Sequence, residues 1–100
     1  GGLSKARRVR DYLVDNAIPV VSEDSWGGEI ATAAVAHFAT STPAEYLINT
    51  TDLMNYNTRG TGLGGPRAAG GRLHAGDSPG LGVAPDFDSL GTPVAVYGGD

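Results

Sequence analysis

Three carboxylates and one tryptophan have a spacing that suggests chemistry at one shared edge. Glu23, Asp24 and Trp26 directly follow a short apolar run, and Asp52 directly follows another. If the two runs are neighbouring parallel strands, they lie about 4.8 Å apart, so the carboxylates can approach a common ligand. Side chains alternate along a strand, so only one of Glu23 and Asp24 can face that ligand, and the pattern does not decide which. Acids at strand ends equally often act as helix caps or loop anchors.

The elements that must position these acids alternate between helix and strand. Residues 3–16 carry an apolar stripe at helical spacing, and residues 29–40 are Ala-rich and helical. Residues 17–24 and 45–52 are short apolar runs with β-branched side chains, which predict strands. A helix joined to two strands by short links predicts a right-handed parallel unit and hence an α/β fold.

Local signals predict how the two helices begin and end. Ser4 is the expected N-cap of the first helix, and Asn16 is its expected left-handed stop. Glu29 falls in the first turn of the second helix, where a negative charge suits the helix dipole. His37 is predicted to be wedged between this helix and the sheet rather than to act in catalysis.

The second half of the chain is rich in Gly and Pro. Most of the 16 Gly and 6 Pro lie there, so residues 59–100 are predicted to be a loop and tail outside the core of residues 1–58. The glycine run 60–65 resembles a phosphate-binding loop, but Pro66 and later glycines prevent the helix that such a loop requires. We therefore predict a flexible surface loop. Two short strands are also predicted, Arg72–His74 and Pro93–Tyr97.

The composition argues against several classes of function. The net charge of -4 and the lack of a basic patch argue against binding to nucleic acid or to an anionic membrane. No apolar run approaches the roughly 18 residues of a membrane span. The chain has no Cys, which fits a cytoplasmic protein. The basic run Lys5–Arg10 is predicted to be a solvated helix face.

Five short motifs follow one another along almost the whole chain. They are Gly1-Gly2-Leu3-Ser4-x-Ala6-Arg7, Ile18-Pro19-Val20, Gly28 to Ala34 with Ala36-His37, Thr51-Asp52, and Pro79 to Val83. In this order they resemble the carboxyl-terminal third of the enolase superfamily, in its mandelate racemase and muconate lactonizing enzyme branch. Within that branch, Glu23 to Gly28 and Leu90 to Tyr97 look most like cis-3-hydroxy-L-proline dehydratases and proline-betaine epimerases.

The resemblance implies the last βα units of a (β/α)7β TIM-type barrel with an α+β capping domain. Residues 3–16 would be the sixth barrel helix and residues 17–24 the seventh strand. Residues 29–40 would be the helix after that strand, and residues 45–52 would be the eighth strand. The tail, residues 59–100, would return to pack on the capping domain.

The resemblance also implies a chemistry. It implies a lyase that removes the proton α to a carboxylate and eliminates water from a hydroxyproline, with Mg2+ stabilising the anion that forms. The metal ligands and the lysine bases are expected before Gly1. No catalytic or metal-binding residue is therefore expected within this segment, which by itself is expected to be inactive. The implied substrate-binding residues are Asp52, Asp24, Glu23 and Trp26. The expected partners are a small amino or imino acid, the remainder of the same polypeptide, and further copies in a homo-oligomer.

Two alternatives remain at this stage. A racemase or epimerase of proline betaines or hydroxyprolines shares the proton-abstraction step. A small non-catalytic α/β binding module belongs to another class, and it predicts that the chain unfolds cooperatively by itself.

Overall fold

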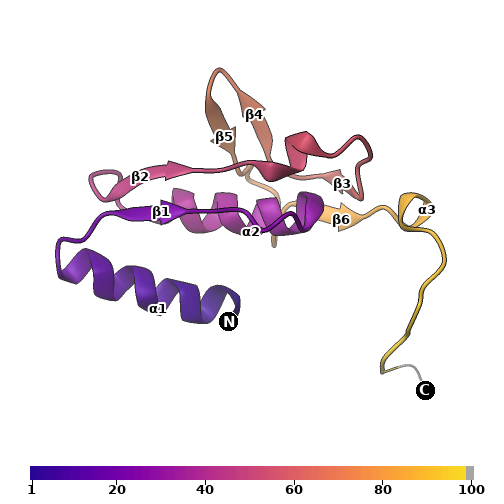
Figure 1. Cartoon of the computed structure of the whole chain (residues 1–100), viewed down its shortest axis with the longest axis horizontal. Coiled ribbons are helices and arrows are strands. Elements are labelled where there is room, and N and C mark those ends of the chain that lie inside the picture. The colour runs from indigo at the N-terminus through magenta and orange to yellow at the C-terminus, as the bar shows by residue number, and fades with distance from the viewer. Residues whose placement is uncertain (99–100) are drawn as a thin grey trace.

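The first half of the molecule is a helix–strand–helix–strand unit (Figure 1). The structure is a computed structural model that describes residues 1–98. Two strands lie side by side, one helix packs behind them, and the other helix runs below the first strand. The elements are α1 (Gly2–Asp15), β1 (Val20–Ser22), α2 (Gly28–Thr40) and β2 (Leu47–Thr50).

β1 and β2 pair in parallel, as the sequence predicts. Val20 lies opposite Leu47 and Ser22 opposite Thr50, with a register irregularity after Val20. The hydrogen-bonded strands are shorter than the predicted 17–24 and 45–52. At one end Ala17 adopts a left-handed conformation with φ 54°, and beyond Ser22 side-chain hydrogen bonds replace the ladder. Each strand has only one neighbour in the described residues, so both outer edges of the pair are unpaired.

α2 packs closely on the strands because its inward side chains are small. Thr32 and Ala33 are fully buried, and Ala36 and Ala39 are nearly so. Small side chains let a helix approach a sheet without voids, and long side chains here would hold it away. Glu29 lies in the first turn of the helix, as predicted.

α1 is less well covered than its apolar stripe predicts. It begins at Gly2 with Gly1 as N-cap, so the expected Ser4 cap is wrong. Asn16 has φ -101° and is not left-handed; Ala17 takes that conformation instead. None of its residues is buried, because α1 contacts α2 and β1 along one side only.

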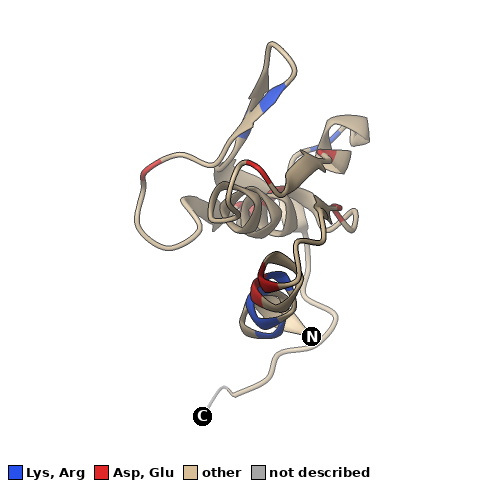
Figure 2. Ribbon diagram, turned by 90° about the vertical axis from the view of Figure 1, so that its left-hand side faces the viewer, with Lys and Arg blue, Asp and Glu red and all other residues tan. Residues whose placement is uncertain are grey.

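α1 carries both basic and acidic residues (Figure 2), and all of them except Arg10 are exposed. Arg10 donates to the Asp11 carboxylate at 2.6 Å and to the Ser41 hydroxyl at 2.6 Å. It also donates to the Ser41 carbonyl oxygen at 3.1 Å. The predicted solvated face is therefore confirmed for Lys5, Arg7 and Arg8, whereas the Arg10 side chain is largely covered and ties α1 to the end of α2.

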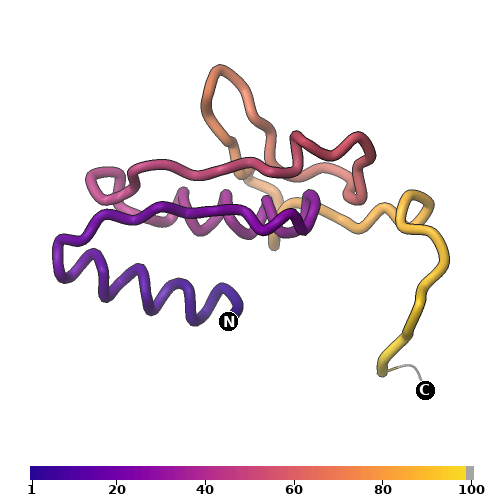
Figure 3. Tube along the Cα trace, in the orientation of Figure 1, coloured from indigo at the N-terminus to yellow at the C-terminus, as the bar shows by residue number. Residues whose placement is uncertain are grey.

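The second half adds short elements around this unit (Figure 3). They are η1 (Leu53–Tyr56), β3 (Gly62–Gly64), β4 (Arg67–Ala69), β5 (Arg72–His74), β6 (Val83–Pro85) and α3 (Phe87–Leu90). β3 pairs with β6 and β4 with β5, both antiparallel. The predicted strand at Arg72–His74 is confirmed. The prediction that residues 60–65 form a flexible loop is wrong for β3, since β6 supplies a partner that lies about 20 residues away in sequence.

The predicted last strand, Pro93–Tyr97, is wrong: within residues 1–98 this segment is not a strand. Val94 and Tyr97 are almost fully exposed. Apolar β-branched residues favour a strand, but a strand needs a neighbour for its hydrogen bonds, and this segment extends away from the rest of the molecule.

The molecule is extended for its size. Its radius of gyration is 15.0 Å, whereas a compact domain of 100 residues has about 13 Å. Few hydrophobic residues are buried in the described part of the chain, and all of them are small or medium-sized: Val20, Ala33, Ala36, Ala39 and Ala75. In the part of the chain that the structure describes, no helix is long and apolar enough to cross a membrane.

Candidate functional site

The candidate site is the edge at which both parallel strands end. There the β1–α2 turn, the first turn of α2 and η1 come together. The sequence places Glu23, Asp24, Trp26 and Asp52 at this edge, and all four lie in these turns. Their side chains nevertheless have different environments.

Asp24 points toward α2 and is only 5% exposed. Its Oδ1 accepts a hydrogen bond from the Ser25 amide at 2.7 Å. Its Oδ2 accepts one from the Thr32 hydroxyl and one from the Leu53 amide at 3.1 Å. Its own amide donates to the Thr51 hydroxyl at 2.8 Å. Both carboxylate oxygens therefore have protein donors, which favours an anchoring role over the substrate contact expected from the sequence.

Glu23 directly follows β1 and is exposed. Burial alternates along this strand: Val20, Ser22 and Asp24 are buried, and the residues between them are exposed. Of the two adjacent acids, Glu23 is therefore the exposed one. Glu23 borders a small apolar cavity of about 230 Å³ beside β1.

Asp52 combines a paired and an unpaired oxygen. Oδ2 accepts a hydrogen bond from the Asn55 side chain at 2.5 Å. Oδ1 is buried and has no donor among the described residues, and the same holds for the Thr50 hydroxyl. An unsatisfied buried polar atom costs about 1–3 kcal/mol, so such an atom marks a place where a further donor fits. Both residues line a cavity of about 750 Å³ between β2 and the β4–β5 hairpin.

Trp26 contacts Tyr56 across the edge. Their ring centres are 5.6 Å apart with an interplanar angle of 43°. Trp26 is 59% exposed and Tyr56 is 73% exposed. Trp26 has φ 63°, a left-handed conformation that is strained for a bulky residue and tends to occur at functional turns. The sequence analysis missed Tyr56, because no local signal in the sequence shows that the turn after Asp52 brings this ring against Trp26.

Glu29 fixes the start of β3 against the start of α2. Its Oε2 accepts hydrogen bonds from the Thr61 amide at 2.9 Å and from the Thr61 hydroxyl at 2.8 Å. Burial by itself would raise the pKa of Glu29, but the hydrogen bonds from Thr61 and nearby backbone amides outweigh it and lower the pKa below 4.5. Glu29 therefore lies in the first turn of α2, as predicted for a helix-dipole role, and it also connects this helix to the start of β3.

His37 lies on α2 in a half-buried position. Its Nε2 is buried and has no hydrogen-bond partner among the described residues. The predicted position between the helix and the sheet stays a prediction, and no side chain among the described residues donates to or accepts from Nε2.

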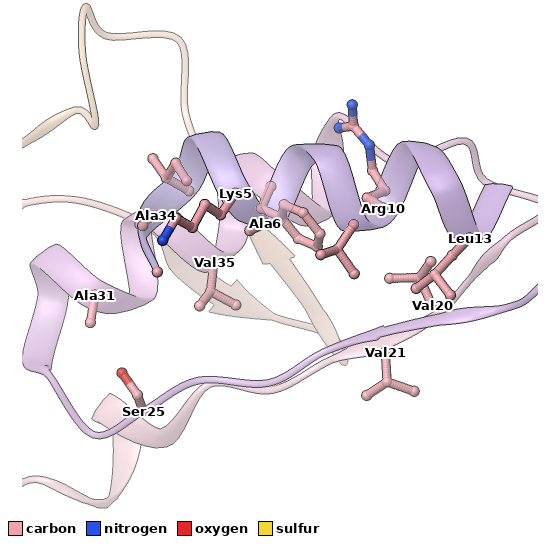
Figure 4. A pocket seen from close by; sticks show the side chains of 15 residues that line it. Lys5, Ala6, Arg10, Leu13, Val20, Val21, Ser25, Ala31, Ala34 and Val35 are labelled. Carbon is pink, nitrogen blue, oxygen red and sulfur yellow. The ribbon is translucent and has the colours of Figure 1, made fainter. Parts of the chain in front are cut away.

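A largely apolar groove of about 620 Å³ runs between α1, β1 and α2 (Figure 4). Ala6, Val21 and Val35 are among its lining residues, and Lys5 and Arg10 supply its charge. The groove follows the unpaired edge of β1. Its chemistry suits contact with apolar polypeptide rather than binding of a polar substrate.

This arrangement has a counterpart among known proteins. Residues 1–89 match the family described as Enolase C-terminal domain-like. The chain belongs to the enolase C-terminal domain-like family. The resemblance seen in the sequence is thereby confirmed.

Relatives within this family narrow the comparison. The chain is 48% identical over 97 residues to a cis-3-hydroxy-L-proline dehydratase of Roseibium aggregatum. The matched region covers 97% of this chain and 26% of that protein. It is 77% identical to a mandelate racemase/muconate lactonizing enzyme of known structure from Roseovarius nubinhibens, with a TM-score of 0.90 over 95% of this chain and 26% of the other. A structure of a second such enzyme from the same organism, complexed with magnesium, is 31% identical, with a TM-score of 0.90 and coverage of 98% and 27%.

The chain spans about a quarter of the length of these relatives. Within residues 1–98, no three His, Asp or Glu side chains come close enough to hold a metal ion. The described residues therefore do not fit a magnesium site by themselves.

Proposed function

We propose that this chain is the carboxyl-terminal barrel segment of a lyase that acts on a hydroxyproline. In the proposed reaction, a base removes the proton α to the carboxylate, the 3-hydroxyl leaves as water, and the resulting enamine rearranges to a pyrroline carboxylate. The observation that carries the proposal is the 48% identity to a cis-3-hydroxy-L-proline dehydratase over 97% of the chain.

The role proposed for this segment is to bind and orient the substrate. A hydroxyproline has a cationic ring nitrogen, which an anionic or aromatic group stabilises. Asp52 has an oxygen without a donor among residues 1–98, Glu23 is an exposed carboxylate, and Trp26 is largely exposed. We assign these three residues to the substrate-binding wall. The base and the Mg2+ ligands are proposed to come from polypeptide outside this chain.

Two features support a place in a closed barrel. Each of the two strands has one unpaired edge, and the apolar groove follows the edge of β1. α1 runs back along β1, so Gly1 and Ser25 line the same groove. Polypeptide that enters α1 from a strand would therefore run parallel to β1 and cover the groove. We propose that the preceding barrel strand occupies this place.

The test uses the complete enzyme, meaning the polypeptide that carries this chain together with its upstream barrel segments. Purified enzyme with Mg2+ is incubated with cis-3-hydroxy-L-proline, trans-4-hydroxy-L-proline or proline betaine, and the products are followed by NMR. Ring unsaturation with loss of the hydroxyl supports the dehydratase. No turnover of cis-3-hydroxy-L-proline would refute the proposed function.

The runner-up is a racemase or epimerase. It is favoured by the 77% identity to a structure described as a mandelate racemase/muconate lactonizing enzyme. The same NMR experiment separates the two, because an epimerase inverts the α carbon, exchanges its proton with D2O and leaves the ring saturated.

A non-catalytic binding module is less well supported by the structure. In the described part of the chain only five hydrophobic residues are buried, none larger than Val, and apolar side chains such as Leu3, Val9 and Val21 are exposed. A domain with so little buried apolar surface is marginal by itself. If the isolated chain unfolds cooperatively on heating, as measured by circular dichroism, that result would support the non-catalytic binding module.

A further inference from the structure

We propose that Asp24 is a positioning residue that locks the substrate-binding edge, not a substrate ligand. The inference rests on the proposed function and deepens it. It assigns to one buried carboxylate the task of holding Asp52 and Trp26 in place. The residues that contact substrate would then depend on a group that substrate never touches.

The contacts of Asp24 join three separate segments. Its carboxylate accepts hydrogen bonds from Ser25 in the β1–α2 turn, from Thr32 on α2, and from Leu53 at the start of η1. The amide of the same residue donates to Thr51 after β2. Hydrogen bonds to an ionised group are roughly twice as strong as neutral ones, so three of them on one buried carboxylate hold these segments firmly.

The segments that Asp24 holds carry the proposed site residues. Leu53 directly follows Asp52, and Thr51 directly precedes it, so Asp24 bonds to both neighbours of the free acid. Trp26 lies two residues after Asp24 and contacts Tyr56 in η1. The left-handed conformation of Trp26 needs support from its surroundings, and the Asp24–Ser25 hydrogen bond lies directly before it.

The position of Asp24 excludes direct contact with a ligand at the open face. It is 5% exposed and faces α2, and each oxygen already accepts at least one hydrogen bond. Thr32 is fully buried, and the hydrogen bond from its hydroxyl to Asp24 connects these segments to α2. We call the Asp24 carboxylate together with its donors on Ser25, Thr32 and Leu53 the clamp. Asp24 would act on substrate binding only through the residues that these hydrogen bonds hold in place.

The test uses the complete enzyme and removes one hydrogen bond to Asp24 while keeping the volume of the side chain that makes it. Thr32→Val keeps the volume of Thr32 but removes its hydroxyl donor, and Thr32→Ser keeps the donor but removes a methyl group. We expect T32V to lower kcat/KM about tenfold, the equivalent of one hydrogen bond to a charged group, and T32S to retain most of the activity. Asp24→Asn should cost more, and Asp15→Asn, an exposed Asp on α1, serves as its matched control.

A double-mutant cycle shows whether the clamp acts through Asp52. In an Asp52→Asn background, T32V should have little further effect on kcat/KM, because the residue it positions is already changed. A loss of the same factor in both backgrounds would show that Asp24 does not act through Asp52 and would overturn the inference. A larger loss in T32S than in T32V would overturn it as well, since packing and not the hydrogen bond would then matter.

Hydrogen exchange tests the clamp without any substrate. The Leu53 and Ser25 amides should exchange at least about tenfold faster in T32V and D24N than in wild type and D15N. If the wild-type enzyme turns over none of the ring substrates but these amides respond, the proposed function fails and the clamp stands. Unchanged exchange in both variants would overturn the clamp whatever the activity.

Discussion

The hydrogen bonds between Glu29 and Thr61 should stabilise the junction of α2 and β3 by a measurable amount. Glu29→Gln keeps an acceptor oxygen but removes the charge. A hydrogen bond to a charged group contributes about 1.5–3 kcal/mol and a neutral one about 0.5–1.5. For two bonds the difference is about 2 kcal/mol, and partial exposure reduces it to about 1–2 kcal/mol. We therefore take about 1–2 kcal/mol as the expected loss.

The contribution of Glu29 should depend on pH in a defined direction. The pKa of Glu29 is lower in the folded protein than its ordinary value of 4.5. A carboxyl group of lowered pKa stabilises the folded state above its unfolded pKa, and this stabilisation disappears as the pH falls through the folded pKa. The loss is therefore expected at pH values below about 4.5, and it should be absent in E29Q.

Amide hydrogen exchange of Thr61 in the complete enzyme measures this junction directly. At neutral pH, E29Q should raise the opening constant of the Thr61 amide about 5- to 30-fold, the equivalent of 1–2 kcal/mol. Glu45→Gln, on an exposed residue before β2, is the matched control and should leave the Thr61 amide unchanged. An opening constant that is equal in E29Q and E45Q would refute the reasoning, because the carboxylate would then add nothing beyond a neutral acceptor.

Three further predictions concern packing and the proposed site. Gly28→Ala should lower the denaturation midpoint of the complete enzyme, because Gly28 has φ 66° and an added Cβ would lie 2.5 Å from the Thr61 hydroxyl; a cost of about 1–3 kcal/mol is expected. Ala33→Leu should destabilise by about 1–3 kcal/mol in urea unfolding, since Ala33 is fully buried. Asp52→Asn should lower kcat/KM by about tenfold or more without moving the urea midpoint, and unchanged kinetics would remove Asp52 from the binding wall.

Much of the first half of the fold could be predicted from local patterns. The apolar stripe of α1 and the small residues of α2 have helical spacing, and the two β-branched runs are too short for helices. Short links between these elements leave few topologies, and parallel pairing follows. The pairing of β3 with β6 could not be predicted, because antiparallel partners far apart in sequence carry no local signal in glycine-rich strands.

The candidate site was predictable in its residue types but not in their orientation. The sequence placed Glu23, Asp24, Trp26 and Asp52 at one edge, and it could not tell which of the adjacent acids faces the open side. The hydroxyl of Thr32 and the amide of Leu53 decide this, because they offer Asp24 donors on the α2 side. Tyr56 was missed because an aromatic pair across a turn depends on where the turn folds.

The sequence by itself determined the alternation of helices and strands, the family, and the set of acids at the strand ends, since these depend on local periodicity and on short motifs in order. Only the tertiary structure decided that Asp24 is enclosed while Glu23 is exposed, that Glu29 holds Thr61, and that Asp52 keeps an oxygen without a donor. The physical reason is that a carboxylate's role depends on the donors around it, and those donors come from residues up to 32 positions away in the chain.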